Sequence, residues 1–122
     1  MFEANLFAED SRIISFTSEG NTKAWQNYAA VSAAKVALEA ITRNIALEFA
    51  SYGIKANCLQ AGVTDTSSLR MIPGSDKIIE HTLKRNPNKR LTLPEDVANA
   101  VYLLCKDEAA WITGTIIPVD GG

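Results

Sequence analysis

The fold is decided by residues 12–60, which read RIISFTSEGNTKAWQNYAAVSAAKVALEAITRNIALEFASYGIKANCLQ. β-Branched and aromatic residues predict a buried strand over Arg12–Thr17 and a second strand over Ile54–Gln60. Between them we expect a long helix over residues 27–52, with Asn27 as its N-cap. Apolar residues recur through that helix at three- and four-residue steps, namely Val31, Ala34, Leu38, Ile41 and Ile45.

The rest of the chain continues the alternation of strands and helices. After a loop over Ala61–Ser68, we expect a short helix over Asp76–Lys84. Thr92 is predicted to cap a further helix, because Pro94 fits a first turn and the acids after it favour the positive end of the helix dipole. Thr115–Val119 is the last predicted strand. Helical spacing in Met1–Ala8 suggests the end of another helix.

Strands that alternate with helices indicate an α/β fold with a parallel sheet and right-handed crossovers. Three parallel strands with flanking helices make a poor sheet alone, because parallel sheets are covered on both faces. We therefore predict that residues 1–122 are a single partial domain, the C-terminal half of a doubly wound, Rossmann-like domain. Within this half-domain, Gly53 is suited to end the long helix predicted over residues 27–52, because glycine readily adopts the left-handed backbone that follows a helix.

Composition excludes several classes of protein. The chain has 122 residues, 47% apolar and 21% charged, which is ordinary for a globular domain and excludes disorder and a disulfide scaffold. Because 12 basic residues face 14 acidic ones, a strongly basic nucleic-acid binder is excluded. No membrane-spanning run or basic leader is visible, so we expect a cytoplasmic protein. Cys58 and Cys105 are predicted to be reduced, buried thiols, and His81, the lone histidine, a surface residue that offers no metal site.

The candidate chemistry lies on the long helix. Tyr28 and Lys35 are seven residues apart, about 700° of helical turn, so they share one face roughly 10 Å apart along the axis. Helical side chains lean toward the N-terminus, so Lys35 is expected to reach back toward Tyr28. A nearby ammonium favours the phenolate, and a phenol tuned in this way can donate a proton to a developing oxyanion. Ser18, at the end of the first strand, would add a hydrogen bond. Taken alone, such a pair is more often a solvated helix edge.

Four segments, in order along the chain, carry a resemblance to a known family: YAAVSAAKVALEAITR (28–43), YGIKAN (52–57), PEDVA (94–98) and ITGTIIPVDGG (112–122). Together they resemble the C-terminal half of the short-chain dehydrogenase/reductase family. A tyrosine seven residues before the lysine is similar to the enoyl-acyl-carrier-protein reductase branch, in which Ser18 marks a serine variant.

The resemblance implies an NAD(P)H-dependent reductase of enoyl thioesters in fatty-acid biosynthesis, with NADH or NADPH as cofactor. By that resemblance, Tyr28 hydrogen-bonds the enolate oxygen and Lys35 holds the nicotinamide ribose, while Ser18 assists. The loop AGVTDT (61–66) matches the family's cofactor loop, which assigns cofactor contacts to Val63 and Thr66 and a close backbone approach to Gly62. An ordinary strand-to-helix turn is the alternative for this loop.

The same resemblance makes residues 69–84 a mobile lid over an acyl chain. Four apolar residues there could line its pocket or simply pack the helix: Met71, Ile72, Ile78 and Ile79. Four basic residues could meet an acidic acyl carrier protein or form a solvated face: Lys84, Arg85, Lys89 and Arg90. The family associates as dimers or tetramers through the helix over Ala29–Ala50 and the last strand.

The family's glycine-rich phosphate loop does not occur in these 122 residues. We therefore expect the isolated chain to be inactive and Arg12–Thr17 to leave an open sheet edge. Two alternatives stay open. The chain could belong to a short-chain reductase of carbonyls, such as 3-oxoacyl thioesters, or it could be a non-catalytic half-domain that only associates with other chains.

Overall fold

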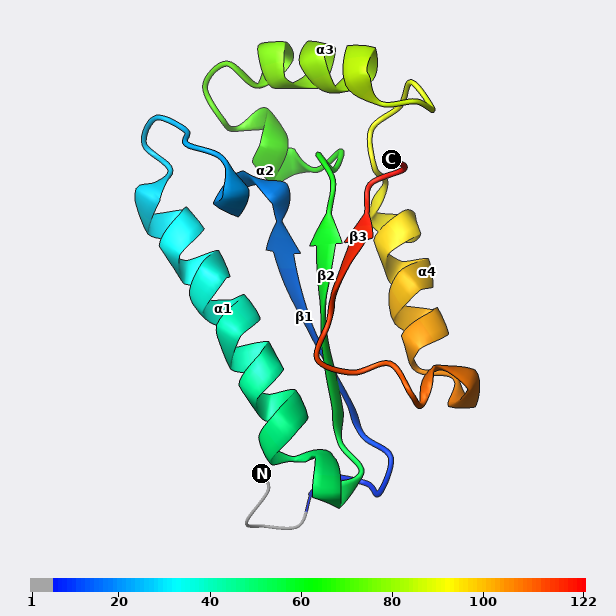
Figure 1. Ribbon diagram of the computed structural model, residues 1–122. Coiled ribbons are helices and arrows are strands. Elements are labelled where there is room, and N and C mark those ends of the chain that lie inside the picture. Colours follow the sequence, from blue (N-terminus) through cyan, green and yellow to red (C-terminus); the bar gives the residue numbers. More distant parts are fainter. Residues whose placement is uncertain (1–5) are drawn as a thin grey trace.

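The computed structural model describes residues 6–122, which contain one sheet of three parallel strands (Figure 1). The strands are β1 (Arg12–Ser18), β2 (Lys55–Ala61) and β3 (Ile116–Val119), in the order β1-β2-β3. Ser18 pairs with Ala61, and Ala61 pairs with Val119, so the three strands end in one row. This row forms a single carboxyl edge, where parallel α/β sheets place their functional sites.

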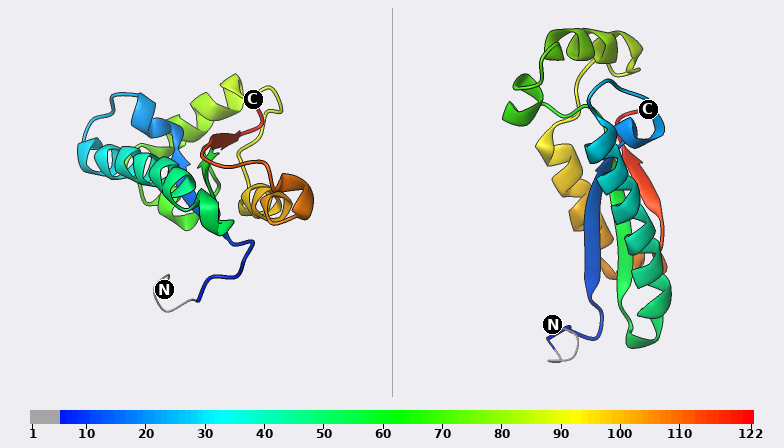
Figure 2. Two further views of the ribbon diagram at one scale, coloured as in Figure 1. Left: turned by 60° about the horizontal axis from the view of Figure 1, so that its bottom comes forward. Right: turned by 90° about the vertical axis from the view of Figure 1, so that its left-hand side faces the viewer.

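Helices cover both faces of the sheet, as the sequence predicts for half of a Rossmann-like domain. Helix α1 (Ala29–Glu48) lies on one face and α4 (Pro94–Leu104) on the other (Figure 2). The short α2 (Ser67–Arg70) and α3 (Ser75–Arg85) lie beyond the carboxyl edge (Figure 1). Three 3₁₀ turns complete the described part of the chain: η1 (Glu19–Thr22), η2 (Ala50–Tyr52) and η3 (Asp107–Ala109). No described helix is long and apolar enough to cross a membrane.

The core lies between the sheet and α4. Leu59, Leu104 and Ala109 form its buried centre, and Val97 and Val101 of α4 pack against it. Val97, Val101 and Leu104 therefore form an apolar stripe on the face of α4 that packs against the sheet. Cys58 is buried as predicted, but the prediction for Cys105 is wrong, because this thiol is exposed. Cys105 follows the last helical residue, so its side chain leaves the stripe where α4 ends.

Helix α1 packs a small and polar face on the sheet. Its buried residues are Glu39, Thr42 and Ala46, whereas Val31 and Ile41 of the predicted apolar period are exposed. The residues that contact the sheet therefore follow the predicted period by about one position, or roughly 100° around the helix. Apolar side chains on the outer face of α1 remain without cover within residues 6–122.

The ends of α1 differ from the prediction. Asn27 adopts a left-handed backbone (φ 61°), and Tyr28 occupies the N-cap position, so Asn27 is not the cap. The helix ends at Glu48 and gives way to η2 instead of continuing to residue 52. Gly53 then takes φ 77°, which confirms that this glycine ends the helical segment.

The predicted N-cap of α4 is also wrong. Thr92 does not cap α4: Leu93 holds the N-cap position, and its backbone N–H donates to Asp96 Oδ2 at 2.8 Å. Thr92 is instead buried, with its N–H donating to the Val63 carbonyl. The helix predicted over Met1–Ala8 lies partly outside the described residues, and Leu6–Ala8 are not helical.

Candidate active site

The carboxyl end of β1 brings together two of the predicted catalytic residues. Ser18 is the last residue of the strand, and its Oγ lies 3.1 Å from the Tyr28 hydroxyl oxygen, within hydrogen-bond distance. Both side chains are half-buried. The sequence predicted that Ser18 and Tyr28 would act on the same atom, and their hydroxyls do meet at the carboxyl edge of the sheet.

Lys35 lies on the same helix, two turns beyond Tyr28. Its Nζ donates to the carbonyl oxygen of Phe16 at 2.9 Å, two residues before Ser18 on β1. An ammonium has three N–H donors, so this hydrogen bond leaves two for another partner. Tyr28 and Lys35 are thus each tied to the last three residues of β1, which lie within roughly 7 Å of strand length.

Gly20 shapes the space for the Tyr28 ring. A Cβ atom on this buried glycine would lie 2.9 Å from Tyr28 Cε1, closer than real side chains approach. Only glycine therefore lets η1 lie against the phenol ring. Local sequence patterns do not point to Gly20, and its place two residues after Ser18 is the only signal they offer.

The loop after β2 is held by its own hydrogen bonds. Gly62 donates to the Val119 carbonyl at 3.1 Å, and a Cβ there would lie 2.7 Å from Thr92 Oγ1. Contact with Thr92 therefore explains the glycine without any ligand. The Thr66 hydroxyl accepts the Leu69 N–H at 3.2 Å, which caps α2 and leaves its own O–H as a donor. Val63 lines the cavity described next.

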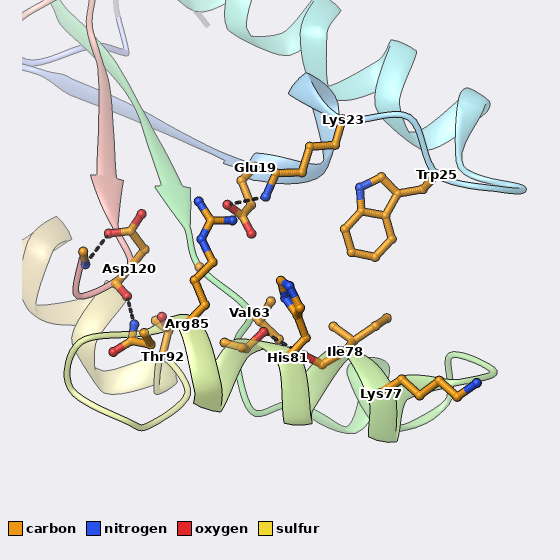
Figure 3. Close-up of a pocket in the computed structure, with 14 residues that line it drawn as sticks. Glu19, Lys23, Trp25, Val63, Lys77, Ile78, His81, Arg85, Thr92 and Asp120 are labelled. Atoms are coloured by element: carbon orange, nitrogen blue, oxygen red, sulfur yellow. Dashed lines mark hydrogen bonds and ion pairs between the residues drawn. The ribbon is translucent and has the colours of Figure 1, made fainter.

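A cavity of about 350 Å³ opens between the carboxyl edge and α3 (Figure 3). Trp25 and His81 face it, and a Glu19–Lys23 ion pair of 3.1 Å lies at its wall (Figure 3). Tyr28 and Ser18 do not line this cavity, but the Trp25 ring lies 6.3 Å from the Tyr28 ring, centroid to centroid. Trp25 therefore links the cavity to the phenol.

Of the apolar residues predicted to line a lid pocket, only Ile78 lines this cavity. Met71 and Ile72 are exposed, and Ile79 is half-buried on α3. His81 is exposed, as predicted, yet it also borders the cavity.

Of the four basic residues predicted to form one face, two have acidic partners on this chain and two do not form an ion pair in the described part of the chain. Lys84 pairs with Glu80 at 2.7 Å and Arg90 pairs with Asp96 at 2.6 Å, so these two cations have partners within the chain. The hydrogen bond from Arg90 is the largest cause that lowers the pKa of Asp96 to about 2, followed by the Leu93 N–H. Lys89 donates to the Lys84 carbonyl at 2.8 Å. Arg85 points from α3 toward Glu19 and Lys23 (Figure 3).

A second, open hollow of about 530 Å³ lies beside β1, between Phe16 and α4. Thr66 borders it, together with Pro94, Val97 and Val101. Within residues 6–122, β2 is the only strand that pairs with β1, so the predicted open edge is confirmed for the described chain. The hollow and the open edge are continuous at Phe16.

Fold and site define a class of protein: part of a Rossmann-like α/β domain with serine, tyrosine and lysine at its carboxyl edge. The chain belongs to the short-chain dehydrogenase/reductase family, since a family model described as "Enoyl-(Acyl carrier protein) reductase" matches residues 2–122. The chain is 33% identical over 119 residues to 1-cyclohexenylcarbonyl-CoA reductase from Streptomyces collinus, covering 96% of this chain and 42% of the relative.

Solved structures of reductases are also similar to this chain. The enoyl-[acyl-carrier-protein] reductase (NADH) from Aquifex aeolicus VF5 is similar with a TM-score of 0.84 and 34% identity, over 93% of this chain and 44% of that one. LugOII, described as a promiscuous reductase that catalyses keto-reduction in lugdunomycin biosynthesis, is similar with a TM-score of 0.82 and 31% identity, over 98% and 46%. The chain thus spans less than half the length of these three proteins.

Proposed function

We propose that this chain forms the C-terminal half of an NAD(P)H-dependent reductase that acts on an enoyl thioester. The observation that carries this proposal is the 3.1 Å approach of Ser18 Oγ to the Tyr28 hydroxyl at the carboxyl edge of a parallel sheet. In this role Tyr28 donates a hydrogen bond, and then its proton, to the oxygen of the substrate thioester. Ser18 holds the phenol in place and adds a second donor.

The polar groups at this edge suit the nicotinamide end of a dinucleotide. Lys35 keeps two N–H donors after its bond to Phe16 O, which match the hydroxyls of a ribose. The Val63 backbone N–H would hold the carboxamide, the Thr66 O–H would contact the cofactor, and Gly62 would allow the close approach. When bound, the cofactor supplies the hydride. The name of the Aquifex aeolicus relative includes NADH, and we propose NADH or NADPH as the cofactor of this chain.

Two features favour an enoyl substrate. Tyr28 precedes Lys35 by seven residues, the spacing of the enoyl-reductase branch, and two of the relatives described above are named as reductases of enoyl or cyclohexenylcarbonyl thioesters. The 350 Å³ cavity, with Ile78 and Trp25 in its walls, is a suitable place for an acyl chain. The likeness to LugOII favours a second candidate, a carbonyl reductase.

A pair of substrates separates these candidates. The complete enzyme that carries this chain is assayed for NADH and NADPH oxidation with crotonyl thioester and with acetoacetyl thioester, each on a carrier protein and on coenzyme A. We expect oxidation with the crotonyl thioester and little with the acetoacetyl thioester. The reverse preference would replace the enoyl reductase with the carbonyl reductase, and activity on neither would contradict both.

We also propose a homo-oligomer, a dimer or tetramer, that covers the outer face of α1 and the last strand. Val36 and Leu47 are exposed on α1, and eleven residues bring them to within about 20° of one another around the helix. These exposed apolar side chains, with Arg43 between them, form the surface that we propose a second copy covers. A cytoplasmic location and a role in fatty-acid biosynthesis follow from the enoyl-reductase proposal.

A further inference from the structure

Glu39 is a carboxyl group that the proposed reaction does not use. It lies on the sheet-facing side of α1 and is 8% exposed. Thr17 Oγ1 donates to its Oε1 at 2.6 Å, and Asn21 Nδ2 donates to the same oxygen. A single oxygen atom therefore holds both ends of the segment 17–21, the first from β1 and the second from η1.

The middle of that segment is what contacts the phenol. Ser18 lies 3.1 Å from the Tyr28 hydroxyl, and Gly20 packs against its ring so closely that a Cβ would lie 2.9 Å from Cε1. With both ends of a five-residue segment fixed, these two contacts cannot shift independently. Since Glu39 and Tyr28 are on the same helix, the carboxyl sets the distance between the helix and the segment.

The orientation of the Asn21 amide is set by the Glu39 carboxyl. Asn21 Oδ1 is buried and makes no hydrogen bond, which carries a free-energy penalty. Turning the amide over would place this oxygen against Glu39 Oε1, two acceptors facing each other. An apolar residue at position 39 would pack α1 on β1 without burying polar groups. The polar cluster therefore serves geometry more than packing.

We propose that Glu39 is a positioning residue, which holds segment 17–21 so that Ser18 and Gly20 fix the phenol of Tyr28 for proton donation. This inference rests on the proposed function, in which Tyr28 is the proton donor. A general role in joining α1 to β1 is the alternative. Another polar pair already joins these elements, because Thr42 Oγ1 lies 2.7 Å from Ser15 Oγ without touching segment 17–21.

The test reads the phenol directly and needs no turnover. The full chain is labelled with ¹³C at tyrosine Cζ, and the Tyr28 signal is assigned with Tyr28→Phe. Ser18→Ala gives the shift that follows loss of the serine contact. We expect Glu39→Leu to move the signal in the same direction by at least half of that shift. Glu39→Gln, which keeps the accepting Oε1, is expected to leave it in place, as is the matched control Thr42→Val.

An unmoved Tyr28 signal in folded Glu39→Leu would overturn the proposal, as would an equal movement in Thr42→Val. If circular dichroism shows that Glu39→Leu does not fold, the Asn21→Ala variant tests the proposal in its place. This variant removes only the bond from η1, so it must also move the signal. Reductase assays on the same variants are interpreted separately. If the proposed function is wrong, these assays fail, but the tyrosine signal still reports the position of the phenol.

Discussion

Tyr28 is held by contacts of two kinds, one from the last residue of β1 and one from the 3₁₀ turn η1 that follows it. Ser18 meets its hydroxyl, and Gly20 leaves room for its ring. The hydroxyl contact is a hydrogen bond between Ser18 and Tyr28, while the ring contact requires that residue 20 has no side chain. A change in either one is therefore expected to move the phenol, with different effects on stability.

Gly20→Ala tests the ring contact. The added methyl group would lie 2.9 Å from Tyr28 Cε1, and overpacking of this kind costs about 1–3 kcal/mol. We expect this loss in the free energy of unfolding, measured with urea. In a Tyr28→Ala background the same substitution should cost much less, because the ring is gone. Equal losses in both backgrounds would mean that Gly20 is required for another reason.

The sequence predicted the meeting of Ser18 and Tyr28 because the apolar run of β1 defines where that strand ends, which places Ser18 at the carboxyl edge of the sheet. It did not reveal Glu39 or Gly20. A lone glutamate in a helix reads as a solvated charge, and only the pairing of β1 with α1 buries it. Its spacing four residues after Lys35 and three before Thr42 was the available signal, since these three side chains share a face.

At the scale of elements, the termini of the helices differ most from expectation. All three strands begin and end within about one residue of their predicted bounds, whereas Asn27 and Thr92 are not the caps that their residue types favour. Buried strands are defined by their own apolar runs. Caps depend on where the chain must turn to reach its neighbours, so tertiary contacts override local preference.

Gly53 marks the turn from η2 into β2, and its replacement has a matched control. Both Gly53 and Gly74 have left-handed backbones, with φ 77° and 80°. A Cβ at Gly53 would lie 2.2 Å from the Glu9 carbonyl oxygen, whereas a Cβ at Gly74 would meet nothing within 4 Å. Gly74→Ala should lose about 1–2 kcal/mol of stability from the left-handed conformation alone. We expect thermal unfolding to show a clearly larger loss for Gly53→Ala.

Asp96 makes the stability of the start of α4 depend on pH. Its folded pKa is about 2, below the usual 3.8, because Arg90 and the Leu93 N–H hydrogen-bond its charged form. A lowered pKa stabilises the fold above pH 3.8, and this stabilisation is lost as pH falls toward 2. We expect the urea midpoints of wild type and Asp96→Asn to differ at pH 6 and to converge between pH 4 and 2. A difference independent of pH would contradict this assignment.

On the scale of the whole molecule, the described residues hold one end of the proposed nucleotide site. Ser18, Tyr28 and Lys35 stand at the carboxyl edge, β1 leaves its outer edge unpaired within residues 6–122, and a hollow of about 530 Å³ lies beside that edge. The chain spans less than half of each of the three proteins compared above. These observations fit a domain whose other half would hold the pyrophosphate.

Residues 1–122 alone are therefore expected to bind NADH weakly. Their sequence has no glycine-rich turn at the start of a helix, so backbone N–H groups for the pyrophosphate are lacking. Fluorescence titration of the purified chain should give no saturation at micromolar NADH. Micromolar affinity would show that the contacts at the nicotinamide end suffice.

The central claim, that Tyr28 is the proton donor of a reductase, is tested most directly by the rate of NAD(P)H oxidation with crotonyl thioester in the complete enzyme that carries this chain. Tyr28→Phe keeps the ring against Gly20 and removes only the hydroxyl, so it should lower kcat by about 10²–10⁴-fold with little change in unfolding temperature. Tyr102→Phe, at an exposed position on α4, is the matched control and should keep the wild-type rate. A Tyr28→Phe enzyme that turns over as fast as the wild type would contradict the assignment.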